Sequence, residues 1–266
     1  MSDLYTLDAP SLPASARPMD FYGREGISQL YRFDLRLSIA HAEALNFDLD
    51  AGLGQRAALL IHAADGSARQ RFNGIVTALE VHSDRAEGSV YAATLAPKFW
   101  ELTLSRHNRI WVDKKLPDIL EDVLRRAGLS GDDYELRLSG RFPTREHVCQ
   151  YRESDYDFMA RWMEQSGIYY FFEQGDAKEK LILANDKGVH TSKGTTRMFA
   201  MGGAEGSNAE GLRRFTGRAL AEPRTYKVTD YNPLTPTTAI ANEQRASSGS
   251  GHAVVRHATD DAANPG

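Results

Sequence analysis

One stretch, residues 145–173, combines the patterns of a strand, a helix and a second strand. Its first part alternates between two faces with the period of a strand. Ser154 can accept a hydrogen bond from a free amide at a helix start, and Gly167 tolerates the left-handed backbone that ends a helix. The helix between them has one apolar face: Phe158, Met159, Trp162 and Met163. The apolar run over residues 168–172 predicts a second, buried strand.

The first third of the chain shows the patterns of antiparallel strands. Residues 31–39 alternate apolar and polar side chains, which is typical of a strand with one buried face. Further elements follow: strands over residues 57–62, 72–82 and 90–95, and turns at 65–66 and 85–88. Several strands joined by short turns predict an antiparallel barrel or sandwich. Residues 98–104 have mixed spacing and are not assigned.

The middle third mixes helix and strand patterns. Five apolar residues at helical spacing predict an amphipathic helix: Leu116, Ile119, Leu120, Val123 and Leu124. Pro117 suits its first turn and Gly128 follows its end. A short strand is predicted over residues 134–138, and residues 181–184 are expected to pair with residues 168–172. The fold class is therefore mainly β with an α+β region inserted between barrel parts.

The remaining segments have weaker patterns. A strand is predicted over residues 225–231, and the sequence beyond Asn242 is polar and is predicted to be poorly ordered. The predicted organisation is an N-terminal irregular arm over 1–20, a first β-barrel (tube) domain over 21–105, an inserted α+β domain over 106–187, a loop or linker over 188–217, and the start of a second barrel with a flexible end over 218–266.

Composition excludes several classes of function. The 266 residues carry a formal net charge of −4 with both signs interspersed, so nothing favours nucleic-acid binding. No apolar run approaches the roughly 18 residues of a membrane span. The N-terminal residues 1–18 lack the basic start and apolar stretch of a signal peptide. The one cysteine, Cys149, excludes an internal disulfide and a cysteine-based zinc site.

The candidates for chemistry each have a simpler structural explanation. Cys149 is expected to be a buried apolar residue, because the alternative of a nucleophile beside His147 lacks an orienting group. Residues 52–57 fit G-x-G-x-x-A, but a strand, not a helix, is predicted to follow them. The acidic residues Glu153, Asp155 and Asp157 are either a catalytic carboxylate pair or, as we expect, helix N-terminal residues with a solvated outer face.

Other motifs are equally unspecific. The eight histidines are scattered without metal-ligand spacing, and residues 247–251 lack the context of a nucleophile elbow. The aromatic run over residues 169–172 is either a sugar-stacking platform or, as we expect, a core or interface strand. We therefore predict no catalytic, cofactor-binding or metal-binding residues and no enzymatic activity.

Several separated motifs resemble VgrG, the spike or tip protein of the bacterial type VI secretion system. The longest lies in the strand–helix–strand stretch: Gln150, Tyr151, Glu153, Ser154, Asp155, Asp157, Phe158, Arg161, Gly167, Ile168, Tyr169 and Tyr170. Earlier matches are Gly23, Glu25, Gly26 and Ser28, and Phe72, Gly74, Ile75 and Val76. The resemblance covers residues 21–231. VgrG is itself similar to the baseplate hub of contractile phage tails.

The resemblance implies a structural role. Hubs of this family form trimers whose barrels make a ring on a tube of Hcp hexamers, together with baseplate components and effectors, and the spike punctures a target cell. It implies assembly in the bacterial cytoplasm and secretion by the type VI system without a signal peptide. The alternatives are a phage-tail baseplate hub and a cell-wall-directed hydrolase.

The family continues beyond the point where this sequence stops, so we expect either a fragment or a short copy. We expect the 266 residues alone to be monomeric or weakly associating, and a chain extended through the needle to be a stable trimer.

Overall fold

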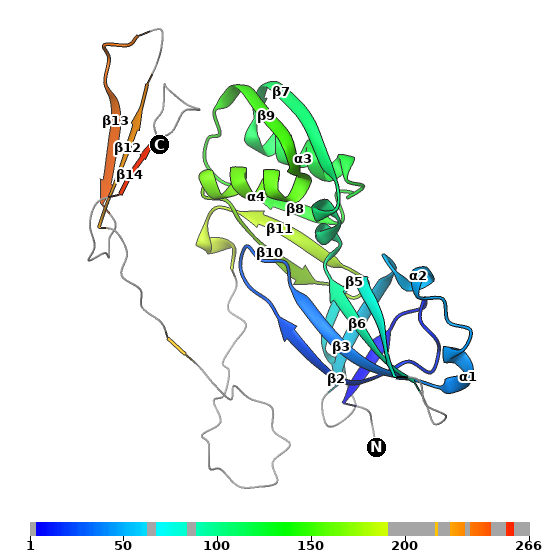
Figure 1. Ribbon diagram of the computed structural model, residues 1–266. Coiled ribbons are helices and arrows are strands. Elements are labelled where there is room, and N and C mark those ends of the chain that lie inside the picture. The colour runs from blue at the N-terminus through cyan, green and yellow to red at the C-terminus, as the bar shows by residue number, and fades with distance from the viewer. Residues whose placement is uncertain are drawn as a thin grey trace. The chain divides into compact units, whose positions relative to one another are not determined.

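The computed structural model describes residues 4–62, 68–83, 89–190, 216–217, 224–231, 235–245 and 254–257. The chain forms two compact units, residues 1–193 and 194–266. The predicted turns at 65–66 and 85–88, the segment 247–251 and most of the predicted linker lie outside the described residues. The first unit contains a barrel lobe and an α+β lobe (Figure 1).

The barrel lobe is one antiparallel sheet, as predicted, and it contains six strands, two more than the sequence indicated. The strands are β1 (Tyr5–Asp8), β2 (Arg17–Arg24), β3 (Arg32–Ile39), β4 (Arg56–His62), β5 (Ala68–Ser83) and β6 (Ser89–Ala96). Their order is β1-β4-β5-β6-β3-β2. The two end strands approach each other, since the rings of Tyr5 and Phe21 meet edge to face at 5.1 Å. The sheet is therefore a nearly closed barrel.

The prediction of an irregular arm over residues 1–20 was wrong. β1 pairs with β4 and β2 pairs with β3, so both ends of the barrel sheet come from this segment. None of the residues of β1 and β2 is fully buried, and those of β2 are mostly exposed. A strand held mainly by its ladder, with little burial, carries no alternating pattern in the sequence.

The barrel core follows the predicted alternation. Along β3, four residues are nearly inaccessible to solvent: Phe33, Leu35, Leu37 and Ile39. Gly74 allows β5 and β6 to approach closely, because a Cβ atom there would lie 2.4 Å from the Ala96 carbonyl oxygen. Two single-turn helices, α1 (His41–Ala44) and α2 (Leu49–Gly52), connect β3 to β4.

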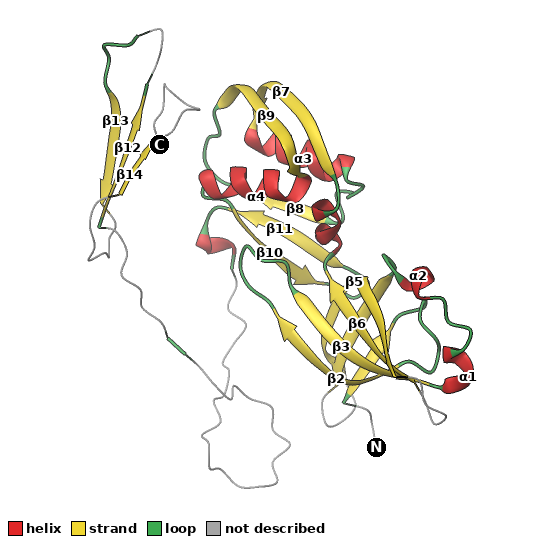
Figure 2. Ribbon diagram, viewed as in Figure 1, coloured by secondary structure: helices red, strands yellow, loops and turns green. Residues whose placement is uncertain are grey.

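The α+β lobe stacks a two-stranded ribbon, two helices and a three-stranded sheet (Figure 2). Its elements in chain order are η1 (Lys98–Thr103), β7 (Arg106–Lys115), α3 (Leu116–Arg126), β8 (Tyr134–Arg137), β9 (Thr144–Ser154), α4 (Asp155–Gln165), β10 (Tyr169–Gln174), β11 (Glu179–Ala184) and η2 (Lys187–Val189). β7 pairs with β9, and the second sheet has the order β10-β11-β8. The antiparallel pairing of β10 with β11 is as predicted.

The helices bury the apolar faces that the sequence predicts. Both form one core with the inner face of the ribbon, where Trp111 stacks on Phe158 at 5.0 Å between ring centroids. The sequence analysis missed β7 because Trp111 is its only buried residue. The unassigned residues 98–104 form the 3-10 helix η1, which buries Phe99 and Leu102.

The second unit contains β12 (Thr225–Asp230), β13 (Ile240–Arg245) and β14 (Val254–His257) in the order β13-β12-β14. The expectation of poor order beyond Asn242 was wrong for residues 243–245 and 254–257. These residues form ladders on either side of β12. Backbone pairing does not need apolar side chains, and β13 is almost wholly exposed.

Candidate functional site

The stretch over residues 145–173 folds as its sequence predicts, into β9, α4 and β10. The Ser154 hydroxyl accepts a hydrogen bond from the Asp157 amide at 3.0 Å and caps α4. Gly167 adopts a positive φ of 67° after the helix. This arrangement places the three acidic residues of the motif at one helix end, so the alternative of a catalytic carboxylate pair depends on their geometry there.

The structure separates these three carboxylates by giving each its own partner. Asp155 is buried and accepts hydrogen bonds from Arg109 at 2.9 Å and Gln150 at 2.7 Å. Asp157 accepts from the Ser154 hydroxyl at 2.6 Å. Glu153 accepts from Arg161 at 2.6 Å. The solvated outer face predicted for this cluster is wrong for Asp155, because the overlying ribbon carries Arg109 and Gln150 inward.

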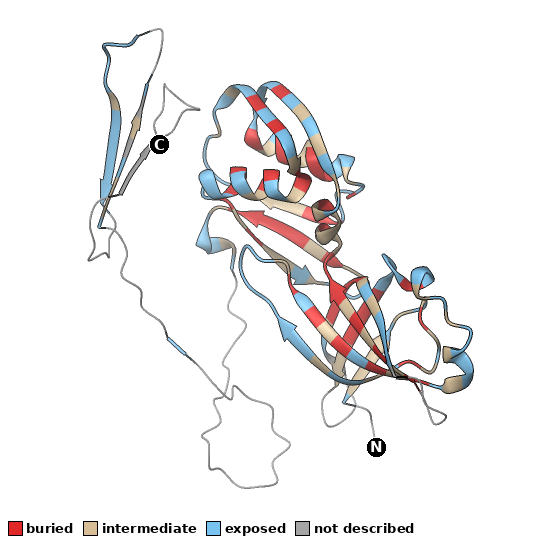
Figure 3. Cartoon of the chain, in the orientation of Figure 1, coloured by how far each residue is buried: buried red, intermediate tan, exposed pale blue. Residues whose placement is uncertain are grey.

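Cys149 is exposed, contrary to the expectation of a buried residue. It lies on the outer face of the β7–β9 ribbon opposite Ile110, while its neighbours Val148 and Gln150 point into the core. Figure 3 shows buried and exposed residues following one another along β9. The outer face of a two-stranded ribbon has no layer above it among the described residues, which the sequence of β9 by itself does not reveal.

The structure does not give the remaining motifs the surroundings that a binding site would need. The Gly-rich residues 52–57 run from α2 directly into β4, so the helix required for a dinucleotide site does not follow. Among the described residues no cluster of His, Cys, Asp or Glu is arranged to hold a metal ion. Within those same residues no helix is long and apolar enough to cross a membrane.

The aromatic run serves both faces of β10. Tyr170 is buried in the α+β core, and Phe172 meets Tyr31 of the barrel edge to face at 5.0 Å. On the other side Tyr169 and Phe171 pack against His190 at 5.6 and 4.7 Å between ring centroids. The run therefore contributes Tyr170 to the core and Phe172 to the contact with the barrel lobe. Tyr170 is too buried to stack on a sugar.

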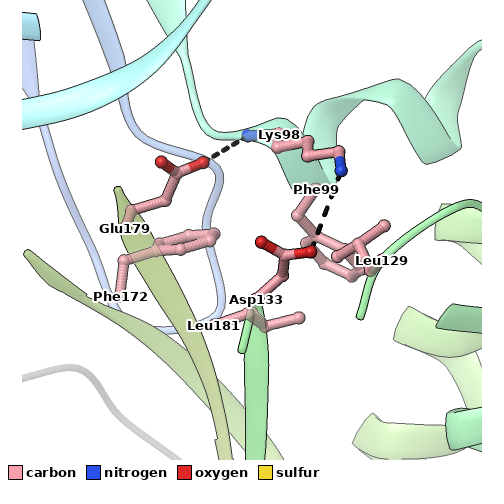
Figure 4. A pocket seen from close by; sticks show the side chains of 7 residues that line it. All are labelled: Lys98, Phe99, Leu129, Asp133, Phe172, Glu179 and Leu181. Atoms are coloured by element: carbon pink, nitrogen blue, oxygen red, sulfur yellow. Dashed lines mark hydrogen bonds and ion pairs between the residues drawn. The ribbon is translucent and has the colours of Figure 1, made fainter. Parts of the chain in front are cut away.

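An ionic cluster around two buried carboxylates, which was not predicted from the sequence, joins the two lobes (Figure 4). Glu179 at the start of β11 accepts from the Lys98 amide at 2.8 Å and from Arg56 of β4 at 3.4 Å. Asp133, before β8, pairs with Lys178 at 2.8 Å and lies 3.8 Å from the Lys98 ammonium. The cavity between them holds about 10 Å³, too small for more than one water. The cluster therefore links the two lobes and does not form a ligand-binding site.

Further contacts continue this joint. The Asn73 side chain of β5 donates to the Gly175 carbonyl at 2.8 Å. The backbone amide of Asn73 donates to the side-chain oxygen of Gln174 at 2.9 Å. The Ser28 amide donates to the Tyr170 carbonyl at 2.8 Å, so the loop before β3 pairs with the outer edge of β10. A sequence signal for this joint existed in Glu179, an acidic residue at the head of an apolar run.

The Asp133 carboxylate makes the joint sensitive to acid. Burial raises its pKa, but hydrogen bonds from Lys178 and Ser130 and the charge of Lys98 outweigh burial and lower the pKa to about 2. The pKa of aspartate in an unfolded chain is about 3.9. The stabilisation is therefore complete above about pH 4 and is lost as the pH falls toward about 2, because the unfolded chain takes up the proton first.

We expect this loss to amount to about 2 kcal/mol in the free energy of unfolding. Urea titrations at neutral pH and at successively lower pH measure it. Asp133→Asn removes the titrating group, so its stability should fall less steeply over the same interval. The exposed neighbour substitution Asp132→Asn is the matched control and should follow the wild type. Parallel pH profiles for wild type and Asp133→Asn would contradict the assignment.

Comparison with known proteins agrees with this architecture. The family model of the phage tail baseplate hub (GPD) matches residues 24–264. The type VI secretion system spike protein VgrG1b of Pseudomonas aeruginosa is 38% identical over 170 residues, which is 64% of this chain and 22% of that protein. The chain therefore spans about a fifth of the length of that relative.

Solved structures share the fold. An Escherichia coli component of the type VI secretion system, described as similar to the T4 bacteriophage tail proteins gp27 and gp5, has 26% identity and a TM-score of 0.64 over 70% of this chain and 51% of its own. A tail protein from Neisseria meningitidis has a TM-score of 0.59 at 10% identity over 98% and 72% of the two chains, which shows the fold alone.

Because the family match covers most of the sequence and the barrel with its α+β lobe recurs in these structures, the chain belongs to the phage tail baseplate hub (GPD) family, with VgrG spike proteins among its relatives.

Proposed function

We propose that this chain is the hub part of a type VI secretion spike. In this proposal three copies form a ring on the end of a tube of Hcp hexamers, and the spike is driven into a target cell with its effectors. The observation that supports it most is the 38% identity to a VgrG spike protein over 170 residues.

The geometry supports a mechanical role. A ring seated on a tube must transmit force without changing shape, and the two lobes of each chain are linked by the Arg56–Glu179 ion pair, by hydrogen bonds from Asn73 and by the Tyr31–Phe172 contact. Interiors and joints packed in this way deform little. The barrel also leaves its end strands β1 and β2 without ladder partners on their outer sides among the described residues, and such edges need a cover.

Binding to the tube tests the proposal. The chain is mixed with purified Hcp hexamers of the same organism and, in parallel, with a phage tail-tube protein. We expect complexes with the Hcp hexamers, detected by light scattering and electron microscopy. Binding only to the phage protein would move the assignment to a phage-tail hub, the second candidate, which the baseplate-hub family match favours. The same scattering data report whether three copies assemble.

The proposal includes the absence of enzymatic activity. We expect no turnover of peptidoglycan, ester or nucleic-acid substrates above a heat-inactivated control, because the three carboxylates at the start of α4 are each bound to separate partners. A general acid and a general base must flank one scissile bond and be free to exchange protons with the substrate. Turnover that disappears in Glu153→Gln or Asp157→Asn would contradict this and restore the hydrolase alternative.

A further inference from the structure

A groove of about 480 Å³ lies beside β7 in the α+β lobe. Arg109, Ile110, Trp111 and Lys114 of β7 form one wall, and α3 forms the other. β9, the hydrogen-bonded neighbour of β7, contributes none of the lining residues. The groove therefore runs along the side of β7 that faces away from β9. No other strand pairs with β7 in the part of the chain that the structure describes.

The groove carries an excess of positive charge. Four cationic side chains line it against two carboxylates, Asp118 and Asp122. Asp122 is already engaged, since it accepts from the Trp111 indole at 2.9 Å and from Arg126 at 2.8 Å. Burial raises the pKa of Asp122, but these two hydrogen bonds outweigh it and keep the carboxylate charged.

Two of the cations remain available to a ligand. Lys114 is exposed. The Arg125 guanidinium lies 3.7 Å from Asp122, beyond hydrogen-bond distance, and its side chain is 65% exposed. Arg125 Nε donates to the Glu121 carbonyl of its own helix at 3.4 Å, and its other guanidinium N–H groups, like the Lys114 ammonium, can turn toward a carboxylate in the groove. The site thus offers cationic groups beside a strand edge that is unpaired among the described residues.

An unpaired edge presents backbone N–H and C=O groups that an added strand can satisfy. Charge decides which strand fits. β7 carries Arg106, Arg109, Lys114 and Lys115 against Asp113 alone, so β7 of a second copy would bring like charges opposite one another. Like charges directly across a ladder are destabilising, whereas an acidic strand gains opposite-charge pairs. The edge therefore selects against a second copy and for an acidic peptide.

We propose that β7 accepts an extended acidic segment of a partner protein as a third strand, whose carboxylates face Lys114 and Arg125. The backbone of the segment would hydrogen-bond to the free edge of β7, and alternate side chains would enter the groove against α3. This inference does not depend on the spike assignment, because it rests on the β7 edge and the charges of the groove.

A defined probe tests this site. The full chain is titrated against a fluorescent peptide, acetyl-Thr-Glu-Val-Glu-Val-Glu-Thr-amide, and binding is followed by anisotropy. We expect saturable binding that Lys114→Glu with Arg125→Glu weakens at least about tenfold. The matched control reverses two exposed cations elsewhere, Arg141→Glu with Lys187→Glu, at the same change in net charge. It should stay within about twofold of the wild type, since neither residue lines the groove.

Backbone pairing is tested with the same peptide. N-methylation at alternate residues removes the donors of one strand edge, so one register of methylation should abolish binding and the other should leave it intact. A peptide with lysine in place of each glutamate should not bind. Equal loss in both charge-reversed pairs, equal effects of both methylation registers, or no binding of the acidic peptide would each overturn the proposal. Salt-resistant self-association of the chain through β7 would overturn it in favour of a second copy.

Discussion

Replacing Trp162 with alanine is expected to lower the free energy of unfolding by about 3–5 kcal/mol, the usual cost of deleting a large buried aromatic side chain. Trp162 is 3% exposed and packs edge to face on Phe158, which in turn stacks on Trp111 of the ribbon. The guanidinium of Arg145 lies over its ring at 4.6 Å. The substitution thus opens a cavity where α4 meets the ribbon and also removes a cation–π contact.

Urea unfolding followed by far-ultraviolet circular dichroism measures the effect without relying on tryptophan emission. Trp162→Phe keeps most of the apolar volume and should cost clearly less. Leu104→Ala is a control at a site that is 67% exposed and should change stability by less than about 0.5 kcal/mol. A loss below about 1 kcal/mol for Trp162→Ala would show that this face of α4 is not part of a packed core.

Removing the Asp155 carboxylate should be comparably costly. We expect Asp155→Ala to destabilise the chain by about 3–5 kcal/mol, because breaking a buried ion pair leaves its partner charge uncompensated. The Asp155 side chain is 2% exposed and that of Arg109 is 18% exposed. Gln150, fully buried, loses the acceptor that lies 2.7 Å from its amide nitrogen. His107 also lies 3.8 Å from this carboxylate.

The same urea titration checks this prediction, with Asp176→Ala as an exposed aspartate control expected to change stability by less than about 0.5 kcal/mol. Replacing both partners, as in Arg109→Met with Asp155→Leu, should cost less than Asp155→Ala alone, since no charge is then left buried. If the double substitution costs the sum of two single ones, the pair is not coupled and the energy lies in packing.

The sequence motif at the start of α4 stabilises the fold both locally and across the lobe. Ser154 and Asp157 close the first turn of α4 locally, whereas Asp155, one residue after the cap, reaches across to the ribbon. The helix start is therefore fixed to β7 by a charge pair. The acidic residues of the motif have a structural use that accounts for their positions, and none of them converges on a common atom.

The joint between the lobes has a similar logic on a larger scale. Its ion pairs connect Arg56 of β4 in the barrel with Glu179 and Asp133 of the α+β lobe. Acid weakens the joint by protonating Asp133. The ring contact between Tyr31 and Phe172 is apolar and does not change charge in the pH range where carboxylates titrate. Loosening at low pH should thus precede global unfolding without abolishing the apolar contact.

The sequence by itself determined the elements whose pattern is local. The alternation over residues 31–39 predicted β3, and Ser154, Gly167 and the apolar face between them predicted α4. Period-two and period-3.6 patterns arise because one face of each element is buried, so they can be read without knowing what buries it. The family-specific spacing of residues 150–170 likewise led to the hub assignment.

Only the tertiary structure decided the features that depend on a neighbour distant in the chain. β1, β2 and β7 are held by ladders to other strands and bury too little to leave a periodic signal, and β14 is held by a ladder to β12. Cys149 is exposed and Asp155 is buried for one reason, the placement of a two-stranded ribbon over α4. Backbone hydrogen bonds and long-range charge pairs do not specify side-chain periodicity, so these contacts appear only once the chain is folded.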